Sequence, residues 1–379
     1  MKVLFVIRSL QRAGAERQLV TLTSGLQARG HNCAVATFYA GGELEAELLA
    51  AGVRLLPLGK QGRWDTIAFQ RRLVKCVRSE APDLLHTYLS GANLMAAQLK
   101  MLLGGIPLVW GLRASFVDMR AYDRFQRTAY RIEPLAARAA DLVICNSQAG
   151  RAAAIAMGYP ARRITTIENG IDTARFRPSE THRAAIRHSW CIGDGAPFFG
   201  IVGRLDPLKD HTSFLHAAAL VRKQQPASRF LILGDGGREQ RINLTDLAAK
   251  LGLTEALHWE PALGAMERIY PALDLRVSAS TTEGFSNVIA EAMACGVPCA
   301  VTDVGDSALI VGDTGAVAPP SNPEALALAI LSVLARRSPA LSEAARARIV
   351  ENYSVERMVL RTEAALADVI DRAKHRKGK

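Results

Sequence analysis

The residues best suited to chemistry in this 379-residue chain lie in two short segments rich in charge and glycine. Arg204 and Lys209, in IVGRLDPLKD, are two cations on one loop, and such a pair can hold the two phosphates of a diphosphate. Glu283 and Glu291, in TTEGFSNVIAEAMACG, are spaced so that both can border one site without touching. Carboxylates accept hydrogen bonds from sugar and ribose hydroxyls, worth about 1.5–3 kcal/mol each. Taken singly, the two cations are also compatible with solvated surface charges, and the two glutamates with helix-capping or surface residues.

The loops around these charges supply further candidate contacts. A helix is expected to begin near Phe285, so the free N–H groups of Phe285, Ser286 and Asn287 would form an anion site at the positive end of its dipole. Gly14, in RAGAER, lets the backbone approach a ligand closely, although the segment is not a GxGxxG dinucleotide fingerprint. His86 ends the apolar run DLLH, where a histidine either faces a ligand or bonds to the backbone.

Short apolar runs alternate with longer amphipathic stretches and indicate how these loops are positioned. The runs are almost continuously apolar, which is typical of parallel strands covered on both faces. Expected strands lie at 2–7, 33–38, 53–58, 83–86, 107–110, 141–145, 164–167, 197–202, 229–233, 256–259, 274–278, 298–301 and 314–318. Repeated strand–helix units predict parallel sheets with right-handed crossovers, and ligands bind beyond the carboxyl ends of such strands.

The strand–loop–helix pattern restarts once, near residue 197. The chain is therefore predicted to be an α/β protein with two doubly wound, Rossmann-like domains facing each other across a cleft. The first domain is expected at 1–178, a linker at 179–196 and the second domain at 197–350. Residues 351–379 form one helical pattern that is expected to cross back and pack on the first domain.

Several classes of protein and site are disfavoured by the sequence. It contains no DxD, HExxH, P-loop or GxSxG motif, so we expect no metal, no cofactor and no serine hydrolase. The first apolar run is too short for a signal peptide, and no apolar stretch is long enough to cross a bilayer. Six cysteines without a CxxC pair favour free thiols in a reducing cytoplasm.

Three segments give the chain a family resemblance. GRLDPLKD, GDGGRE and EGFSNVIAEAMACGVPCAVTDVGD are similar, in order and spacing, to segments of the retaining glycosyltransferases of family 4, the group 1 glycosyl transferases. Glu283 and Glu291 match the E-x7-E motif of that family, and the resemblance runs over nearly the whole chain. It implies the glycosyltransferase-B architecture, with a nucleotide sugar on the C-terminal domain and an acceptor on the N-terminal domain.

The resemblance also assigns roles. Arg204 and Lys209 would neutralise the donor diphosphate, Glu283 would bind the sugar hydroxyls and Glu291 the ribose. Backbone amides would touch the sugar and phosphate, and Gly14 would approach the phosphates; the amides are those of Gly284, Phe285, Ser286 and Asn287. The catalytic candidates are Arg204, Lys209, Glu283 and His86. The family retains anomeric configuration without metal, by a route in which the leaving phosphate takes the acceptor's proton, and fixed cations there lower the barrier.

The chain departs from the family pattern at three places. Ala13 replaces the first of two glycines in the first loop, and Tyr88 stands where the family often has a second histidine. HWEPAL, at 258–263, replaces the usual base-binding segment. The expected activity is transfer of a sugar, with a UDP-sugar favoured, to a lipid-linked or polysaccharide acceptor in bacterial surface glycan biosynthesis. The alternative is a sugar-nucleotide epimerase or hydrolase on the same fold.

The net charge of +11 is carried by the first domain. Residues 1–180 hold 24 Lys and Arg against 14 Asp and Glu, whereas 181–350 hold 16 against 17. Arg120, Arg124, Arg127 and Arg131 would share one helix face. This face predicts either an anionic membrane or acceptor-phosphate contact, with peripheral attachment to the inner side of the membrane, or a solvated basic surface. A nucleic-acid partner is not expected, because no aromatic-plus-basic motif or helix-turn-helix pattern accompanies the charge.

Overall fold

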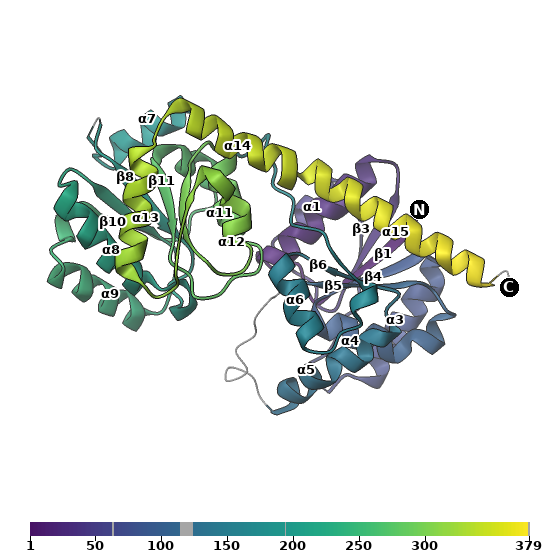
Figure 1. Cartoon of the computed structure of the whole chain (residues 1–379). Coiled ribbons are helices and arrows are strands. Elements are labelled where there is room, and N and C mark those ends of the chain that lie inside the picture. The colour runs from purple at the N-terminus through teal and green to yellow at the C-terminus, as the bar shows by residue number, and fades with distance from the viewer. Residues whose placement is uncertain (63, 114–123, 194, 378–379) are drawn as a thin grey trace. The chain divides into compact units, whose positions relative to one another are not determined.

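The computed structural model describes residues 1–62, 64–113, 124–193 and 195–377, which form two compact units (Figure 1). Unit 1 comprises Met1–Gly170 and Val355–Lys379, and unit 2 comprises Ile171–Ser354. The boundary falls earlier than the expected residue 178, because Ile171 packs in the core of unit 2 and bridges to Ser354. The expected linker at 179–196 instead contains helix α7 (Glu180–Ser189), which packs against the 3-10 turn η7 (Tyr270–Ala272) of unit 2.

Unit 1 is built on a parallel seven-stranded sheet with the order β3-β2-β1-β4-β5-β6-β7. The order reverses beside β1, as in doubly wound folds, so the loops after β1 and β4 leave the same edge of the sheet. The strands are β1 (Lys2–Ile7), β2 (Asn32–Thr37), β3 (Arg54–Pro57), β4 (Leu84–Tyr88), β5 (Leu108–Leu112), β6 (Leu142–Cys145) and β7 (Ile164–Thr166).

Two apolar clusters cover the two faces of this sheet. On one face α1, α2 and the C-terminal helix α15 pack, and on the other α3, α4, the 3-10 turn η1 and α6 pack (Figure 1). The helices of unit 1 are α1 (Gly14–Ala28), α2 (Glu45–Ala50), α3 (Ile67–Glu80), α4 (Leu89–Leu99), η1 (Lys100–Leu103), α5 (Arg124–Ala136), η3 (Ala137–Ala139), α6 (Gln148–Ala156), η4 (Ala161–Arg163) and α15 (Val355–Lys377). Helix α15 contributes Met358, Val359, Leu366, Val369 and Ile370 to the first cluster.

Unit 2 is built on a parallel six-stranded sheet with the order β10-β9-β8-β11-β12-β13. The strands are β8 (Phe198–Val202), β9 (Arg229–Leu233), β10 (Leu257–Glu260), β11 (Leu275–Ser278), β12 (Cys299–Thr302) and β13 (Ala316–Ala318). Strands β8 and β11 are neighbours at the centre of the sheet although β9 and β10 lie between them in the chain, because the sheet order reverses there. This reversal is where ligands bind in open α/β sheets.

Helices cover both faces of the second sheet as well. Helices α8, α9 and α13 pack on one face, and α11, α12 and α14 on the other (Figure 1). The remaining helical elements are η5 (Pro207–Lys209), α8 (His211–Gln224), α9 (Arg238–Lys250), η6 (Thr254–Ala256), α10 (Met266–Ile269), α11 (Asn287–Ala294), α12 (Ser307–Val311), η8 (Gly312–Thr314), α13 (Pro323–Ala335) and α14 (Pro339–Tyr353).

The sequence pattern predicts this layout closely. Each expected apolar run overlaps one strand of the described chain, and the two parallel sheets confirm the predicted fold class. Of the described helices, none is by itself long and apolar enough to cross a bilayer; α13 and α14 meet that test only together, as a pair bent by 111°. All six cysteines are free thiols, and Cys191 is exposed.

Candidate active site

The carboxyl edge of the unit 2 sheet brings together the loops that follow β8 and β11. Arg204 and Lys209 lie on the first loop and Glu283 on the second. The Thr281 N–H donates to the Leu208 carbonyl at 2.9 Å, so the two loops are joined by the backbone as well as by their strands. Residues far apart in sequence are therefore held in one place by the strand order.

Lys209 and Glu283 form an ion pair at the centre of this edge. The Lys209 Nζ lies 2.5 Å from the Glu283 Oε1, and the Ser280 hydroxyl donates to the same oxygen at 2.8 Å. The two side chains are 26% and 11% exposed, so the pair is only partly screened by water. The structure thus joins a cation and an anion that the sequence places 74 residues apart.

Arg204 lies on the same loop and pairs with a different carboxylate. Its side chain is 82% exposed, and Nη2 lies 3.2 Å from the Asp206 Oδ2. Asp206 also accepts a bond from the Leu208 N–H at 2.9 Å and so shapes η5. An exposed pair of this kind contributes little, about 0–1 kcal/mol, so the guanidinium can turn to a ligand at low cost.

Gly305, in the loop after β12, supports the backbone of Glu283. Its φ is +58°, and a Cβ there would lie 2.5 Å from the Glu283 carbonyl oxygen and 2.6 Å from that of Gly284. The Asp306 N–H donates to the Gly284 carbonyl at 3.0 Å. This contact fixes the height of the Glu283–Gly284 segment above the sheet, and only glycine fits it.

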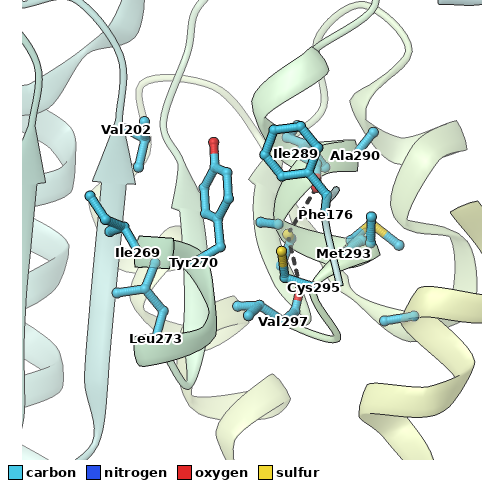
Figure 2. Close-up of a cluster of buried hydrophobic side chains, with 14 of the residues drawn as sticks. Phe176, Val202, Ile269, Tyr270, Leu273, Ile289, Ala290, Met293, Cys295 and Val297 are labelled. Atoms are coloured by element: carbon cyan, nitrogen blue, oxygen red, sulfur yellow. Dashed lines mark hydrogen bonds between the residues drawn. The ribbon is translucent and has the colours of Figure 1, made fainter. Parts of the chain in front are cut away.

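Glu291, two turns into α11, is paired with a tyrosine that sequence reasoning missed. The Tyr270 hydroxyl donates to the Glu291 Oε2 at 3.2 Å. Figure 2 shows Tyr270 between Val202, at the end of β8, and Ile289 and Ala290 of α11. Burial and the nearby Glu291 carboxylate hold the pKa of the Tyr270 phenol well above its ordinary value.

The start of α11 differs slightly from the expectation. The helix begins at Asn287, with Ser286 at its N-cap, rather than near Phe285. The Phe285 ring is buried against Tyr353, so its side chain belongs to the core and only its backbone can serve a ligand. The Ser286 hydroxyl is buried and has no hydrogen-bond partner among the described residues, and it makes no bond to the helix. In the sequence, Ser286 lies directly before Asn287 and three residues after Glu283.

In unit 1, His86 does not occupy the position expected for it. Strand β4 continues to Tyr88, so His86 is inside the strand and its side chain is fully buried. Its ring lies 5.2 Å from that of Phe5 and 4.8 Å from that of Tyr88. Burial and the charge of Arg113 hold the pKa of His86 well below its ordinary value. The expectation that His86 ends its strand is therefore wrong. Both ring nitrogens are buried and have no hydrogen-bond partner among the described residues, so the ring is not bonded to the backbone there. A ligand contact of His86 stays a prediction.

Arg113 lies directly after β5, at the carboxyl edge of the sheet where His86 was expected. Its Nη2 donates to the Tyr88 hydroxyl at 2.6 Å, its Nη1 donates to Asn169 at 3.2 Å, and the guanidinium stacks 4.6 Å from the Tyr88 ring. The pairing depends on β4, β5 and the segment after β7 meeting at one edge, which only the strand order reveals. The only hint of the Arg113–Tyr88 pairing in the sequence is that Tyr88 stands where the family often has a second histidine.

Two other predicted features of unit 1 are placed as follows. Gly14 is exposed and is the first residue of α1, with Ala13 at the N-cap and no side chain bonded to the helix end. Of the arginines expected on one basic helix, Arg120 lies outside the described residues and α5 begins at Arg124. Arg127 and Arg131, on α5, are exposed.

One hollow of unit 2 lies away from these residues. A cavity of about 640 Å³ borders Asp274, which directly precedes β11 at the opposite edge of the sheet. Arg183, Arg187 and Arg337 lie 2.6, 3.3 and 3.0 Å from the Asp274 carboxylate and already satisfy it. In the described part of the chain no group of three or more His, Cys, Asp or Glu side chains is arranged to hold a metal ion.

Comparisons with known proteins give the same architecture. The chain is 32% identical to the D-inositol 3-phosphate glycosyltransferase of Mycolicibacterium vanbaalenii over 254 residues, which are 62% of this chain and 55% of that protein. The chain thus spans about half the length of this curated relative. Its fold matches Anabaena Alr3699/HepE in complex with UDP, with a TM-score of 0.86 at 23% identity, covering 97% of this chain and 100% of the other. A glycosyltransferase from Rickettsia africae matches with a TM-score of 0.80 at 17% identity, covering 97% and 98%.

Two family models divide the chain between them. The model of Glycosyltransferase Family 4 matches residues 12–175, which lie almost wholly in unit 1. The model of Glycosyl transferases group 1 matches residues 196–336, which carry the Lys209–Glu283 pair. With both models in sequence order and the glycosyltransferase-B fold around them, the chain belongs to the group 1 glycosyl transferases of glycosyltransferase family 4.

Proposed function

We propose that this chain is a retaining, metal-independent glycosyltransferase that moves a sugar from a UDP-sugar to a lipid-linked or polysaccharide acceptor. The observation that carries the proposal is the Lys209–Glu283 pair at the carboxyl edge of the unit 2 sheet. In this pair, a cation that can bind phosphate lies beside a carboxylate that can accept hydrogen bonds from hydroxyls. Both are at the edge of the sheet where ligands of such folds bind. The choice of UDP is supported by Anabaena Alr3699/HepE, which has been solved with UDP and with UDP-glucose.

Arg204 and Lys209 would neutralise the donor diphosphate. Both are cations on one loop, and Arg204 is exposed enough to turn toward a ligand without losing a strong contact. The buried, unbonded Ser286 hydroxyl and the amides of Gly284, Phe285, Ser286 and Asn287 would add donors at the positive end of α11. Charge builds on the leaving phosphate in the transition state, so these fixed donors lower the barrier.

Glu283 and Glu291 would orient the two hydroxyl-bearing parts of the donor. Glu283 is held by Lys209 and Ser280 and would accept from the sugar, while Glu291 is held by Tyr270 and would accept from the ribose. The acceptor hydroxyl oxygen would attack the anomeric carbon on the face from which the phosphate leaves. The bond from that carbon to the phosphate oxygen breaks, and the acceptor proton passes to the same phosphate oxygen.

The acceptor would bind to unit 1, with Arg113 at its anionic group. The guanidinium is stacked on Tyr88 and bonded to its hydroxyl, so it is oriented before any acceptor arrives. The relative from Mycolicibacterium vanbaalenii is called a D-inositol 3-phosphate glycosyltransferase, a name that supports a phosphate-bearing acceptor. The loop that contains Gly14 would reach the donor phosphates. We place the protein in the cytoplasm, acting on bacterial surface glycans at the inner side of the membrane.

A product analysis with UDP-glucose tests this proposal. Incubation with a lipid extract should give glucosylated lipid that keeps the α configuration of the donor, with and without EDTA. Without acceptor, UDP should appear only slowly. Rapid release of UDP and free sugar without acceptor would support the hydrolase or epimerase alternative, and loss of transfer with EDTA would overturn metal independence.

The nucleotide is tested separately by thermal unfolding with UDP, GDP and ADP. A nucleotide at 100 times its dissociation constant should raise the free energy of unfolding by about 2.7 kcal/mol. When the three nucleotides are compared at one common concentration, we expect UDP to give the largest shift. For the Lys209→Ala variant, the matched control is Lys223→Ala, which also removes one lysine but at an exposed position on α8.

A further inference from the structure

Large apolar side chains of unit 1 are exposed close to a row of cations. Trp64 is 88% exposed, Met101 93%, Ile67 66% and Leu102 56%. Single exposed apolar residues are ordinary on a protein surface, but a group of them beside basic residues marks an interaction site. All four lie on or next to α3 and η1, on the sheet face that these elements cover.

Helix α3 has one buried and one basic face. Phe69, Leu73 and Val77 are buried in the cluster on the sheet. Ile67, Arg71, Lys75 and Arg78 are exposed, and their spacing places them along one side of the helix. Such a division, apolar toward the sheet and cationic toward solvent, leaves the cations in a line parallel to the helix axis.

The turn η1 continues this line beyond Arg78. The Arg78 Nη2 donates to the Leu102 carbonyl at 3.2 Å, which ties η1 to the last turn of α3. Leu103 is buried, and the Lys100 Nζ pairs with Asp141 at 2.9 Å. Because the residues on either side are anchored, Met101 and Leu102 are held in outward positions.

Trp64 lies at the other end of this row of cations, before α3, in a loop that is held by hydrogen bonds and an ion pair. Arg72 donates from Nε to the Leu58 carbonyl at 2.8 Å and pairs with Asp65, and the Thr66 N–H donates to the Trp64 carbonyl at 2.8 Å. Arg72 and Asp65 therefore neutralise each other within the loop. Trp64 and Ile67 follow the carboxyl end of β3, so they lie at the same sheet edge as Arg113.

We propose that this docking surface binds an anionic lipid bilayer; it consists of Trp64, Ile67, Arg71, Lys75, Arg78, Met101 and Leu102. The charge favours that partner, because unit 1 has 29 Lys and Arg against 16 Asp and Glu, whereas unit 2 has 18 against 20. The nearby Glu80 is already paired with Arg54 at 2.7 Å. Tryptophan and aliphatic side chains enter the headgroup region, while Lys and Arg contact acidic lipid headgroups.

The inference goes beyond the transfer reaction and does not rest on the donor site. In this proposal the residues that contact the membrane lie on or next to α3 and η1, not on α5. Docking through this face would set the Trp64 edge of unit 1 at the lipid surface. A lipid-linked acceptor would then reach Arg113 from the bilayer.

Vesicle flotation of the full chain tests the proposal. Wild-type protein should float with vesicles of phosphatidylcholine and phosphatidylglycerol, and not with phosphatidylcholine alone or in high salt. Arg71→Gln with Lys75→Gln should weaken binding about thirtyfold, since each basic residue near an anionic surface contributes about a factor of five. Trp64→Ser with Met101→Ser should weaken it at least about tenfold. Leu49→Ser with Leu360→Ser, on α2 and α15 of the opposite face, is the matched control and should bind as wild type.

Two results would overturn the inference. Equal recovery on neutral and anionic vesicles would exclude charge-dependent docking. Loss of binding in Arg127→Gln with Arg131→Gln, but not in Arg71→Gln with Lys75→Gln, would place the contact on α5. UDP binding without vesicles should be unchanged in every variant, which separates this test from failure of the proposed donor site and from misfolding.

Discussion

At the residue scale, the chemistry of unit 2 centres on a cation and an anion that already satisfy each other. Lys209 and Glu283 are 2.5 Å apart and mostly buried. In the proposed function each has a separate ligand, the diphosphate for Lys209 and the sugar for Glu283. The ion pair therefore holds both side chains in place before the donor binds, and donor binding must weaken it. Removing one partner should then affect the two halves of the donor differently.

The first prediction compares Lys209→Ala with Glu283→Gln. Lys209→Ala should weaken UDP binding about 10- to 100-fold, because a charged hydrogen bond to phosphate is lost. Glu283→Gln should leave UDP binding equal or tighter, because the ammonium is released, while kcat/KM with UDP-glucose falls about 10- to 100-fold. Calorimetric titration with UDP and initial transfer rates measure the two effects. If both variants lose UDP binding equally, the separate roles of the pair are wrong.

The second prediction concerns His211, the first residue of α8. Burial, with the nearby Lys209 charge, lowers the pKa of His211 from 6.5 to about 4, against the opposing effect of Asp210 and Asp206. Between those values the unfolded chain binds a proton that the folded chain does not, so stability falls as the pH falls through this range. His211 should account for about 3 kcal/mol of that loss.

Urea unfolding between pH 4 and pH 7 measures the loss attributed to His211. The His211→Gln variant should show a shallower dependence of the unfolding free energy on pH than the wild-type chain. His188→Gln, at an exposed histidine on α7, is the matched control and should keep the wild-type slope. An unchanged slope in His211→Gln would show that this histidine titrates alike in both states.

At the element scale, the loop after β12 is the support on which Glu283 rests. The third prediction is that Gly305→Ala lowers both stability and UDP binding. The added Cβ would meet the Glu283 carbonyl at 2.5 Å, and φ is +58°, so the loop must move; the expected cost is about 1–3 kcal/mol of unfolding free energy. Thermal unfolding and UDP titration measure the two losses.

A matched control separates backbone strain from displacement of Glu283. Gly252 has φ +69° with nothing within 4 Å of the position of an added Cβ. Gly252→Ala should therefore cost only the left-handed conformation, about 1 kcal/mol, with UDP binding intact. Equal UDP affinity in both variants would show that Gly305 does not position the site.

Elements were easier to predict from the sequence than the contacts between them. Continuous apolar runs predicted every described strand, because buried parallel strands leave that pattern regardless of their neighbours. His86 was misplaced because β4 continues through the polar Thr87, where the apolar pattern stops. The Tyr270–Glu291 and Arg113–Tyr88 pairs depend on packing between separate elements, and no local pattern encodes such packing. Helix α7 was hidden by the glycines that follow it.

At the scale of the whole molecule, unit 1 is assembled from two distant parts of the chain. Helix α15 supplies five apolar side chains to the cluster on α1 and β1, and Leu366 among them is fully buried. Without α15 the apolar side chains on that face of unit 1 would be exposed to solvent. The family model that matches 12–175 therefore describes less than the folding unit.

The last prediction is that unit 1 folds alone only when both parts are present. A Cβ on Gly170 would lie 2.8 Å from the Val355 Cα, so the two ends of unit 1 meet and a short Gly-Ser linker can join residues 1–170 to 355–379. This joined protein should unfold cooperatively and show protected amides in α1 by hydrogen exchange, whereas residues 1–178 alone should not. A Leu366→Ala version of it should lose about 2–5 kcal/mol, and Leu360→Ala, at a position 41% exposed, should lose much less. Cooperative folding of residues 1–178 would instead mean that α15 only covers a core that is already stable.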